Sequence, residues 1–336
     1  MNTRRKIVFA LGASALVSPL SSLVFPRPSF AQQQGKIWRV GFLLQSHLDF
    51  VDSHLAYGPF RQGMRELGYV DGKNLMIEWR SAEGNIERLP ELATELVRLK
   101  PDVLVTQGTP AARAAQKATA VIPIVMSSGD LVGSGLVKSL VRPGGNSTGL
   151  SLMAAELGPK LLEMLHSMAP KATHVAVLVN PLNASTVLGL KNILVAARKL
   201  GVKIQPVEAG TPQQIAEAFA LMARQNTEAL IVTQDSSFVQ QKKLIADLAM
   251  KQRLPAISGF VEYVEAGGLM SYGQSIRENF RRAATYVDKI FKGANPGELP
   301  VEQPTRFEMA VNLKTAKALG IKVPQTILIQ ATRVIE

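Results

Sequence analysis

The chain contains no cysteine and few histidines, and these shortages exclude several kinds of chemistry. Without cysteine, its 336 residues can form no disulfide, thiol nucleophile, thiolate metal site or lipid-modified N-terminal cysteine. The four histidines show no ligand spacing such as HExxH. We therefore expect no metal site in this protein.

Aromatic residues make up only 6% of the chain, and the positive charges are not clustered. The formal net charge is +12, but Lys and Arg occur singly or in pairs such as Lys242-Lys243 and Arg281-Arg282. A nucleic-acid surface needs a basic patch, commonly with aromatic side chains on which bases stack. We therefore expect no nucleic-acid partner. With 46% hydrophobic residues, the chain can bury substantial cores.

The first 31 residues have the pattern of a secretory signal peptide. Arg4-Arg5-Lys6 precedes an apolar run, and small residues lead up to Ala31. Pro19 and Pro26 interrupt the run before it could span a membrane, which argues against an embedded anchor. We predict cleavage near Ala31 and export to the periplasm, by a twin-arginine (Tat) or a Sec route. Export disfavours NAD and ATP as cofactors, and we expect no cofactor.

From Trp38 onward, apolar runs of strand length alternate with segments of helical period. The runs are apolar throughout rather than alternating, as in a parallel sheet that helices cover on both faces. The sequence therefore predicts an α/β fold. The predicted strands are 38–44, 74–81, 102–107, 123–128, 147–152, 174–180, 203–209, 229–235, 255–260 and 268–273.

The strands fall into two series, which predict two Rossmann-like lobes with parallel central sheets. We expect the first lobe to comprise 36–150 plus about 274–303, and the second to comprise 151–273 plus about 304–336. In this arrangement the chain crosses three times between the lobes. A ligand would lie between them, at the carboxyl ends of the strands.

The turns that follow these strands are rich in hydroxyls, amides and glycines. None places a nucleophile beside a base, a pair of carboxylates or a phosphate-loop Lys. We therefore expect binding without catalysis and propose no catalytic residue. The candidate ligand-binding residues are Gln45, Ser46, Thr106, Gly108, Thr109, Ser127, Ser128, Asp130, Asn180, Asp235, Ser236, Phe260 and Tyr272.

The turn TQGTPAA (106–112) allows two interpretations. Thr109 could simply be the N-cap of a helix, with Pro110 at its first position. Alternatively, the free N–H groups of this helix and the Thr109 hydroxyl could hold an anionic group such as a carboxylate, with Gly108 allowing close approach. The pattern alone leaves both interpretations open.

Asp130 and Asp235 each follow a strand, and each allows the same two interpretations. Either could be a helix cap, or either could accept a hydrogen bond from an ammonium group. An anion site facing an acid describes a zwitterion, so an amino acid is the natural ligand. Phe260 and Tyr272 could pack on its side chain, although aromatic residues at strand ends commonly belong to the core.

Several segments in order along the chain resemble a known family. They include RQGMRELGYVDG, TQGTPAARAA, RPGGNSTGLS, EAGGLMSYG and LPVEQPTRFEMAVNLKTAKALG. The chain from about Trp38 to Glu336 resembles the periplasmic substrate-binding proteins of ABC transporters, in the group that includes tryptophan- and tyrosine-binding proteins.

The resemblance implies a type I periplasmic-binding fold, with a hinge of three strands and closure of two lobes around one ligand. It also implies an ABC permease and its ATPase as partners, and we expect a monomer. Gln45, Gln107 and Leu131 depart from the commonest family pattern, so the aromatic amino acid that the family suggests is the least transferable implication.

Two other functions compete with a transport receptor. An exported sensor that binds the same class of ligand would share every candidate residue. A secreted α/β hydrolase would need a nucleophile with a nearby base, or a carboxylate pair, in the cleft.

Overall fold

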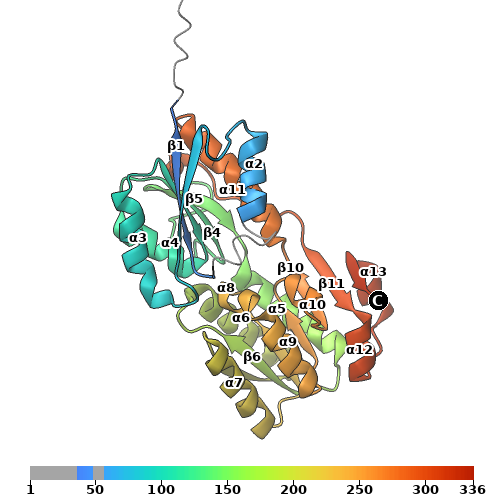
Figure 1. The fold of residues 1–336 in the computed structure, drawn as a ribbon. Helices are drawn as coiled ribbons and strands as arrows, with labels where there is room; N and C mark the ends of the chain where they lie inside the picture. Colours follow the sequence, from blue (N-terminus) through green and yellow to red (C-terminus); the bar gives the residue numbers. More distant parts are fainter. Residues whose placement is uncertain (1–35, 48–56) are drawn as a thin grey trace, which may run out of the picture. The chain divides into compact units, whose positions relative to one another are not determined.

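The computed structural model of the chain describes residues 36–47 and 57–336 (Figure 1). The described residues do not include the predicted signal peptide and its cleavage site. They also do not include His54, one of the four histidines. Two sheets organise the remainder, and each belongs to one α/β lobe.

The first sheet has five parallel strands in the order β2-β1-β3-β4-β5. These strands are β1 (Trp38–Leu44), β2 (Leu75–Ser81), β3 (Val103–Gln107), β4 (Ile124–Ser128) and β5 (Ser147–Ser151). The helical segments among them are α2 (Tyr57–Glu66), η1 (Ile86–Arg88), α3 (Leu89–Arg98) and α4 (Thr109–Ala118). Every residue of β3, β4 and β5 is buried, as expected for strands whose two faces are covered.

The second sheet has seven strands in the order β12-β11-β10-β9-β8-β6-β7. These strands are β6 (His174–Val179), β7 (Lys203–Glu208), β8 (Ala229–Val232), β9 (Ala256–Ser258), β10 (Met270–Gly273), β11 (Glu308–Asn312) and β12 (Arg333–Ile335). Its helices are α5 (Ala154–Met168), α6 (Ala184–Leu200), α7 (Pro212–Arg224), α8 (Ser236–Gln240), α9 (Lys242–Lys251), α10 (Glu262–Glu265), α12 (Leu313–Leu319) and α13 (Gln325–Gln330). Pro206 lies on the edge strand β7, where a missing N–H breaks no central ladder.

The predicted α/β fold of two lobes with parallel central sheets is confirmed, but the second sheet also contains one antiparallel pairing. β11 pairs with β10 in the antiparallel direction, and the sequence analysis did not predict β11 or β12. The chain returns from the first sheet before it forms β11, so β11 is not part of a local βα unit. The repeating βα pattern therefore does not predict it. β12 has only three residues and is largely exposed, so it lacks the longer apolar run from which the other strands were predicted.

Three segments carry the chain from one sheet to the other. They lie between β5 and α5, between β10 and α11 (Ile276–Phe291), and between η2 (Pro296–Glu298) and β11. The helix α11 packs beside α2 and against the first sheet (Figure 1). This close approach needs a glycine, since a Cβ on Gly63 would lie 2.7 Å from the Arg281 carbonyl oxygen.

Aromatic side chains fasten α11 to the first sheet. Phe291 stacks on Trp38 with 4.1 Å between ring centroids, and Phe280 lies 5.7 Å from Phe42. Such pairs add to the apolar burial of the helix face. Because α11 is tightly packed, its first turns are held at the point where the chain crosses between the sheets.

Candidate functional site

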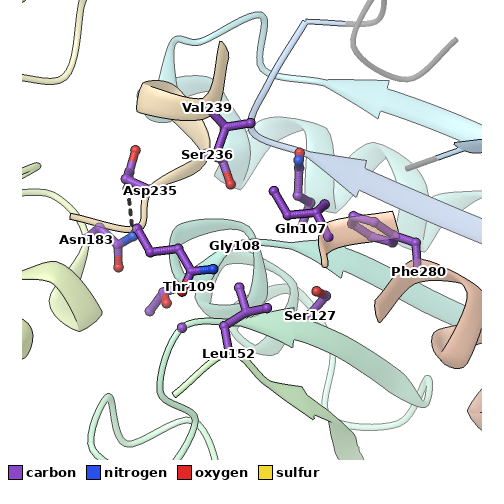
Figure 2. A pocket seen from close by; sticks show the side chains of 13 residues that line it. Gln107, Gly108, Thr109, Ser127, Leu152, Asn183, Asp235, Ser236, Val239 and Phe280 are labelled. Carbon is purple, nitrogen blue, oxygen red and sulfur yellow. Dashed lines mark hydrogen bonds between the residues drawn. The ribbon is translucent and has the colours of Figure 1, made fainter. Parts of the chain in front are cut away.

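The carboxyl ends of the strands in both sheets meet around a small cavity of about 30 Å³ (Figure 2). The first lobe supplies Gln107, Gly108, Thr109, Ser127 and Gly129, together with Leu152 from the first crossing segment. The second lobe supplies Asn183, Gln234, Asp235, Ser236 and Val239. Ile276 and Phe280 of α11 complete the wall. The cavity is therefore built from parts of the sequence that are up to 173 residues apart, as Gln107 and Phe280 illustrate.

The first-lobe wall is formed by the beginning of α4 and the hydroxyls beside it. Gly108 is the N-cap residue with a φ of 85°, and α4 begins at Thr109. The Thr109 and Ser128 hydroxyl oxygens are 2.7 Å apart and share a hydrogen bond. Since the first N–H groups of a helix have no partner within it, this wall favours an anionic group.

The interpretation of Thr109 as an N-cap with Pro110 at the first helical position was wrong. The helix begins one residue earlier, and no side chain caps it. The reason is Gly108, which adopts a positive φ that other residues rarely tolerate. The Thr109 hydroxyl is consequently free to bond Ser128 instead of its own helix.

Glutamine side chains connect this wall with its surroundings. The Ser46 hydroxyl donates to Gln107 Oε1 over 2.6 Å. Gln45 Nε2 donates to the Ser237 hydroxyl of the second lobe over 2.8 Å. The Gln45–Ser237 hydrogen bond is buried, so it joins the two lobes without competition from water.

The second-lobe wall carries a buried carboxylate, Asp235. Only 2% of this residue is exposed. Its oxygens accept hydrogen bonds from Asn183 Nδ2 (2.7 Å), Asn180 Nδ2 (3.2 Å) and the Ser237 N–H (2.8 Å). Figure 2 shows Asn183 and Asp235 on one side of the cavity. The hydrogen bond from the Ser237 N–H makes Asp235 the N-cap of α8, so the interpretation of Asp235 as a helix cap is confirmed.

No ion pair among the described residues includes Asp235. A buried carboxylate without a cation retains an uncompensated charge, although its hydrogen bonds reduce the penalty. The cavity therefore has one negatively charged wall, formed by Asp235, and one wall suited to an anion, formed by α4 and its hydroxyls. Together they fit a zwitterion.

The two lobes are in close contact beside the cavity. A Cβ on Gly129 of the first lobe would lie 2.3 Å from the Ser185 hydroxyl of α6. A Cβ on Gly108 would lie 3.2 Å from the Ser236 hydroxyl. Glycine at these two positions lets the strand ends of one lobe approach the helix starts of the other.

The predicted site residues fall into three groups: those that line the cavity, those that are buried and mostly bonded to its lining, and those that do not line it. Gly108, Thr109, Ser127, Asp235 and Ser236 line it. Gln45, Ser46, Thr106, Ser128 and Asn180 are buried; all except Thr106 bond the lining residues or their neighbours through their side chains. Asp130, Phe260 and Tyr272 do not line it.

Each of these last three residues has a different structural setting. Asp130 Oδ1 accepts a hydrogen bond from the Gly133 N–H over 2.8 Å, within its own loop. Phe260 is fully buried in the core, and Tyr272 stacks on Phe307 with 5.5 Å between ring centroids. The strand-end rule placed them near the correct edge but not in the cavity.

Several lining residues were not predicted from the sequence. Gln107, Gly129 and Gln234 lie directly beside predicted site residues, and Asn183 lies three residues after Asn180. Ile276 and Phe280 had no usable signal, because they continue the apolar face with which α11 packs on the first sheet. Leu152 and Val239 likewise look like ordinary core residues.

One further buried carboxyl group lies outside the cavity. Burial raises the pKa of Glu262 in α10 to about 7, and the nearby Glu265 and Glu308 act in the same direction. Its Oε2 atom has no hydrogen-bond partner. Glu262 is thus a titratable group of the second lobe that ligand binding does not explain.

The part of the chain that the structure describes holds neither a metal-binding cluster nor a membrane-spanning helix. No three His, Cys, Asp or Glu side chains within 36–47 and 57–336 gather as they would around a metal ion. No helix in the same part of the chain has both the length and the apolar character needed to cross a membrane.

Comparison with known proteins gives consistent matches. The family model described as ABC transporter substrate binding protein matches residues 51–335. The chain is similar to the tyrosine-binding protein of Clostridioides difficile (strain R20291), at 27% identity over 264 residues, 78% of this chain and 76% of that protein.

Solved structures show the same fold. A conserved domain protein from Vibrio cholerae has a TM-score of 0.83 at 28% identity, covering 89% of this chain and 100% of its own. The ABC domain in complex with L-Trp from Streptococcus pneumonia has a TM-score of 0.80 at 24% identity, covering 89% of this chain and 99% of its own. The family model spans most of the sequence, and it confirms the resemblance carried by segments such as RPGGNSTGLS. The chain therefore belongs to the ABC transporter substrate-binding protein family.

Proposed function

We propose that this chain is the periplasmic solute-binding component of an ABC importer and that it captures an α-amino acid between its two lobes. The observation that carries the proposal is Asp235, a buried carboxylate without an ion-pair partner that faces the hydroxyls and helix start of the opposite lobe. The α-ammonium group binds Asp235, and the α-carboxylate binds at Thr109 and the first turn of α4.

The small cavity implies that the ligand enters when the lobes separate and is enclosed when they close. Closure excludes water and strengthens each polar contact. We expect a dissociation constant in the micromolar range or tighter, which corresponds to about −8 kcal/mol. The ligand leaves chemically unchanged, and we propose no catalytic step.

The names of two related proteins support the proposal that the ligand is an amino acid. The relative from Clostridioides difficile is a tyrosine-binding protein, and one structure with the same fold is a complex with L-Trp. Both ligands are zwitterions of the kind that the two walls of the cavity fit.

The proposed route places the chain outside the cytoplasm. After export and cleavage near Ala31, it would diffuse as a monomer and deliver its ligand to a permease that a cytoplasmic ATPase drives. N-terminal sequencing of the exported protein tests this step, and a mature N-terminus far from Gln32 would contradict it.

A thermal-shift screen of the purified protein with the twenty L-amino acids tests the ligand class. At least one should raise the Tm in proportion to its occupancy, with titration calorimetry giving the dissociation constant. If no amino acid raises the Tm, the proposal fails.

Deletion of the gene separates transport from sensing. An importer component predicts loss of uptake of the radiolabelled amino acid. Unchanged uptake together with a lost transcriptional or chemotactic response would identify the alternative function, an exported sensor.

A further inference from the structure

Two buried glutamines, one in the wall of the cavity and one near it, have amide atoms without a hydrogen-bond partner among the described residues. Gln234 lines it, is 8% exposed, and has no partner for either Oε1 or Nε2. Gln45 is fully buried, and its Oε1 has no partner although its Nε2 bonds Ser237. Buried amides are nearly always paired in native proteins, so a group of this kind needs an explanation.

Gln45 does not line the cavity, but it lies close to a residue that does. A Cβ on Gly108, a cavity residue, would lie 3.0 Å from Gln45 Oε1. The amide nitrogens of Gln274 and Asn279, which are close to Ile276 and Phe280 in the sequence, likewise have no hydrogen-bond partner among the described residues.

The chemistry of Gln234 selects one kind of side chain. Its carboxamide offers a donor and an acceptor at once. A second carboxamide offers the complementary acceptor and donor, so the two groups can form a paired hydrogen bond. A phenyl ring would leave both atoms of Gln234 unpaired in a buried place. An indole has a single N–H donor and no acceptor, so it would leave at least the Gln234 Nε2 donor unpaired.

The apolar part of the lining also suits a side chain that ends in a carboxamide. The alkyl part of such a side chain can lie against Leu152, Val239 and Ile276.

We propose that Gln234 forms a side-chain subsite that selects an amino acid ending in a carboxamide over an aromatic one. This inference rests on the proposed function, since Asp235 and the α4 wall must already hold the ammonium and carboxylate groups. It departs from the ligands that the tyrosine-binding relative and the L-Trp complex indicate.

Titration calorimetry with a small panel tests the inference on the purified protein. The panel comprises L-glutamine, L-asparagine, L-serine, L-alanine, L-leucine, L-tyrosine and L-tryptophan. We expect L-glutamine or L-asparagine to bind at least tenfold more tightly than L-leucine, L-tyrosine and L-tryptophan. Tightest binding of any other member would overturn the inference and leave the proposed function standing, whereas no binding by any amino acid would refute the proposed function itself.

The variant Gln234→Leu tests the residue. It should reduce the ratio of carboxamide to leucine affinity at least tenfold, mainly by loss of the carboxamide ligand. A ratio distinguishes lost selectivity from a general loss of binding. The matched control is Gln213→Leu on α7, where the glutamine is exposed and bonds only Glu217, and it should leave the ratio unchanged. A ratio that stays the same in Gln234→Leu would also overturn the inference.

Discussion

Two aspartates follow strands at the same kind of edge, yet the structure gives them different environments. Asp235 follows β8, is 2% exposed, and accepts three hydrogen bonds at the wall of the cavity. Asp130 follows β4, is partly exposed, and accepts one side-chain hydrogen bond from the Gly133 N–H of its own loop. Position at a strand end is therefore not enough to place an acid in the site.

The difference arises from the segment that comes next. After Asp235 the chain enters α8 directly, so the carboxylate caps the helix and stays in the interior. After Asp130 the chain makes a loop, and the carboxylate closes that loop at the surface. Asn180 and Asn183 then supply further donors to Asp235 from a neighbouring turn.

The largest effect is expected from Asp235→Asn. Asn can still cap α8, but it removes the charge that binds the ammonium group. We expect binding to weaken by about 2–5 kcal/mol, while the free energy of unfolding falls by about 1 kcal/mol. Titration calorimetry and urea denaturation measure the two quantities. Equal losses would mean that Asp235 is only a cap and would remove the distinction from Asp130.

Glu262 extends the comparison to a buried carboxyl group whose Oε2 atom has no hydrogen-bond partner among the described residues. Its pKa of about 7 lies above the ordinary value of 4.5 because of burial. The folded state therefore holds a proton that the unfolded state loses between these two pH values, so the contribution of this group to stability is greatest below pH 4.5 and falls until about pH 7. We expect Glu262→Gln to remove this slope and to be up to about 3 kcal/mol more stable than the wild type at pH 8.

Urea denaturation between pH 4 and pH 8 checks this prediction. The wild type and Glu262→Gln should have similar stabilities at the acidic end and diverge as the pH rises. An identical pH slope in both proteins would show that another group is responsible.

A substitution at Gly129, the residue before Asp130, tests what this turn contributes to closure of the two lobes. A Cβ there would collide with Ser185 of the other lobe, and Gly129 is not among the glycines with positive φ. Gly129→Ala should therefore fold normally but weaken ligand binding by about 1–3 kcal/mol. Gly58→Ala is the control, since nothing lies within 4 Å of a Cβ at Gly58. Small-angle scattering with ligand should show a less closed Gly129→Ala protein, and full closure would refute the explanation.

The smallest effect is expected from Asp130→Ala. The substitution removes the hydrogen bond to Gly133 and should lower the free energy of unfolding by about 1 kcal/mol. Ligand affinity should change less than twofold, because Asp130 does not line the cavity. A tenfold loss of affinity in calorimetry would show that both strand-end acids bind the ligand.

The sequence was sufficient to predict the ten strands of the βα series and to give helix capping as one of two interpretations of Asp235. Periodicity and local capping carry this information. It was not sufficient for the start of α4, because the positive φ of Gly108 depends on the packing of the turn. It could not show the antiparallel β11, since the pairing partner is set by the return of the chain.

The contents of the cavity were predictable only in part. Thr109 and Asp235 follow from the rule that ligands bind at strand ends. Phe280 does not, since its spacing on α11 is that of a core residue. The unpaired amide atoms of Gln234 and Gln45 depend on which neighbours lie within hydrogen-bonding distance, and no sequence pattern reports that.

The most direct test is to compare an amino acid with its des-amino analogue. Titration calorimetry would use the L-amino acid that raises the Tm most and the same carboxylic acid with hydrogen in place of the ammonium group. We predict that the wild type binds the des-amino acid at least thirtyfold more weakly, a difference of about 2 kcal/mol, and that Asp235→Asn hardly distinguishes the two. Equal affinity of the wild type for both compounds would contradict the assignment of Asp235 to the ammonium group.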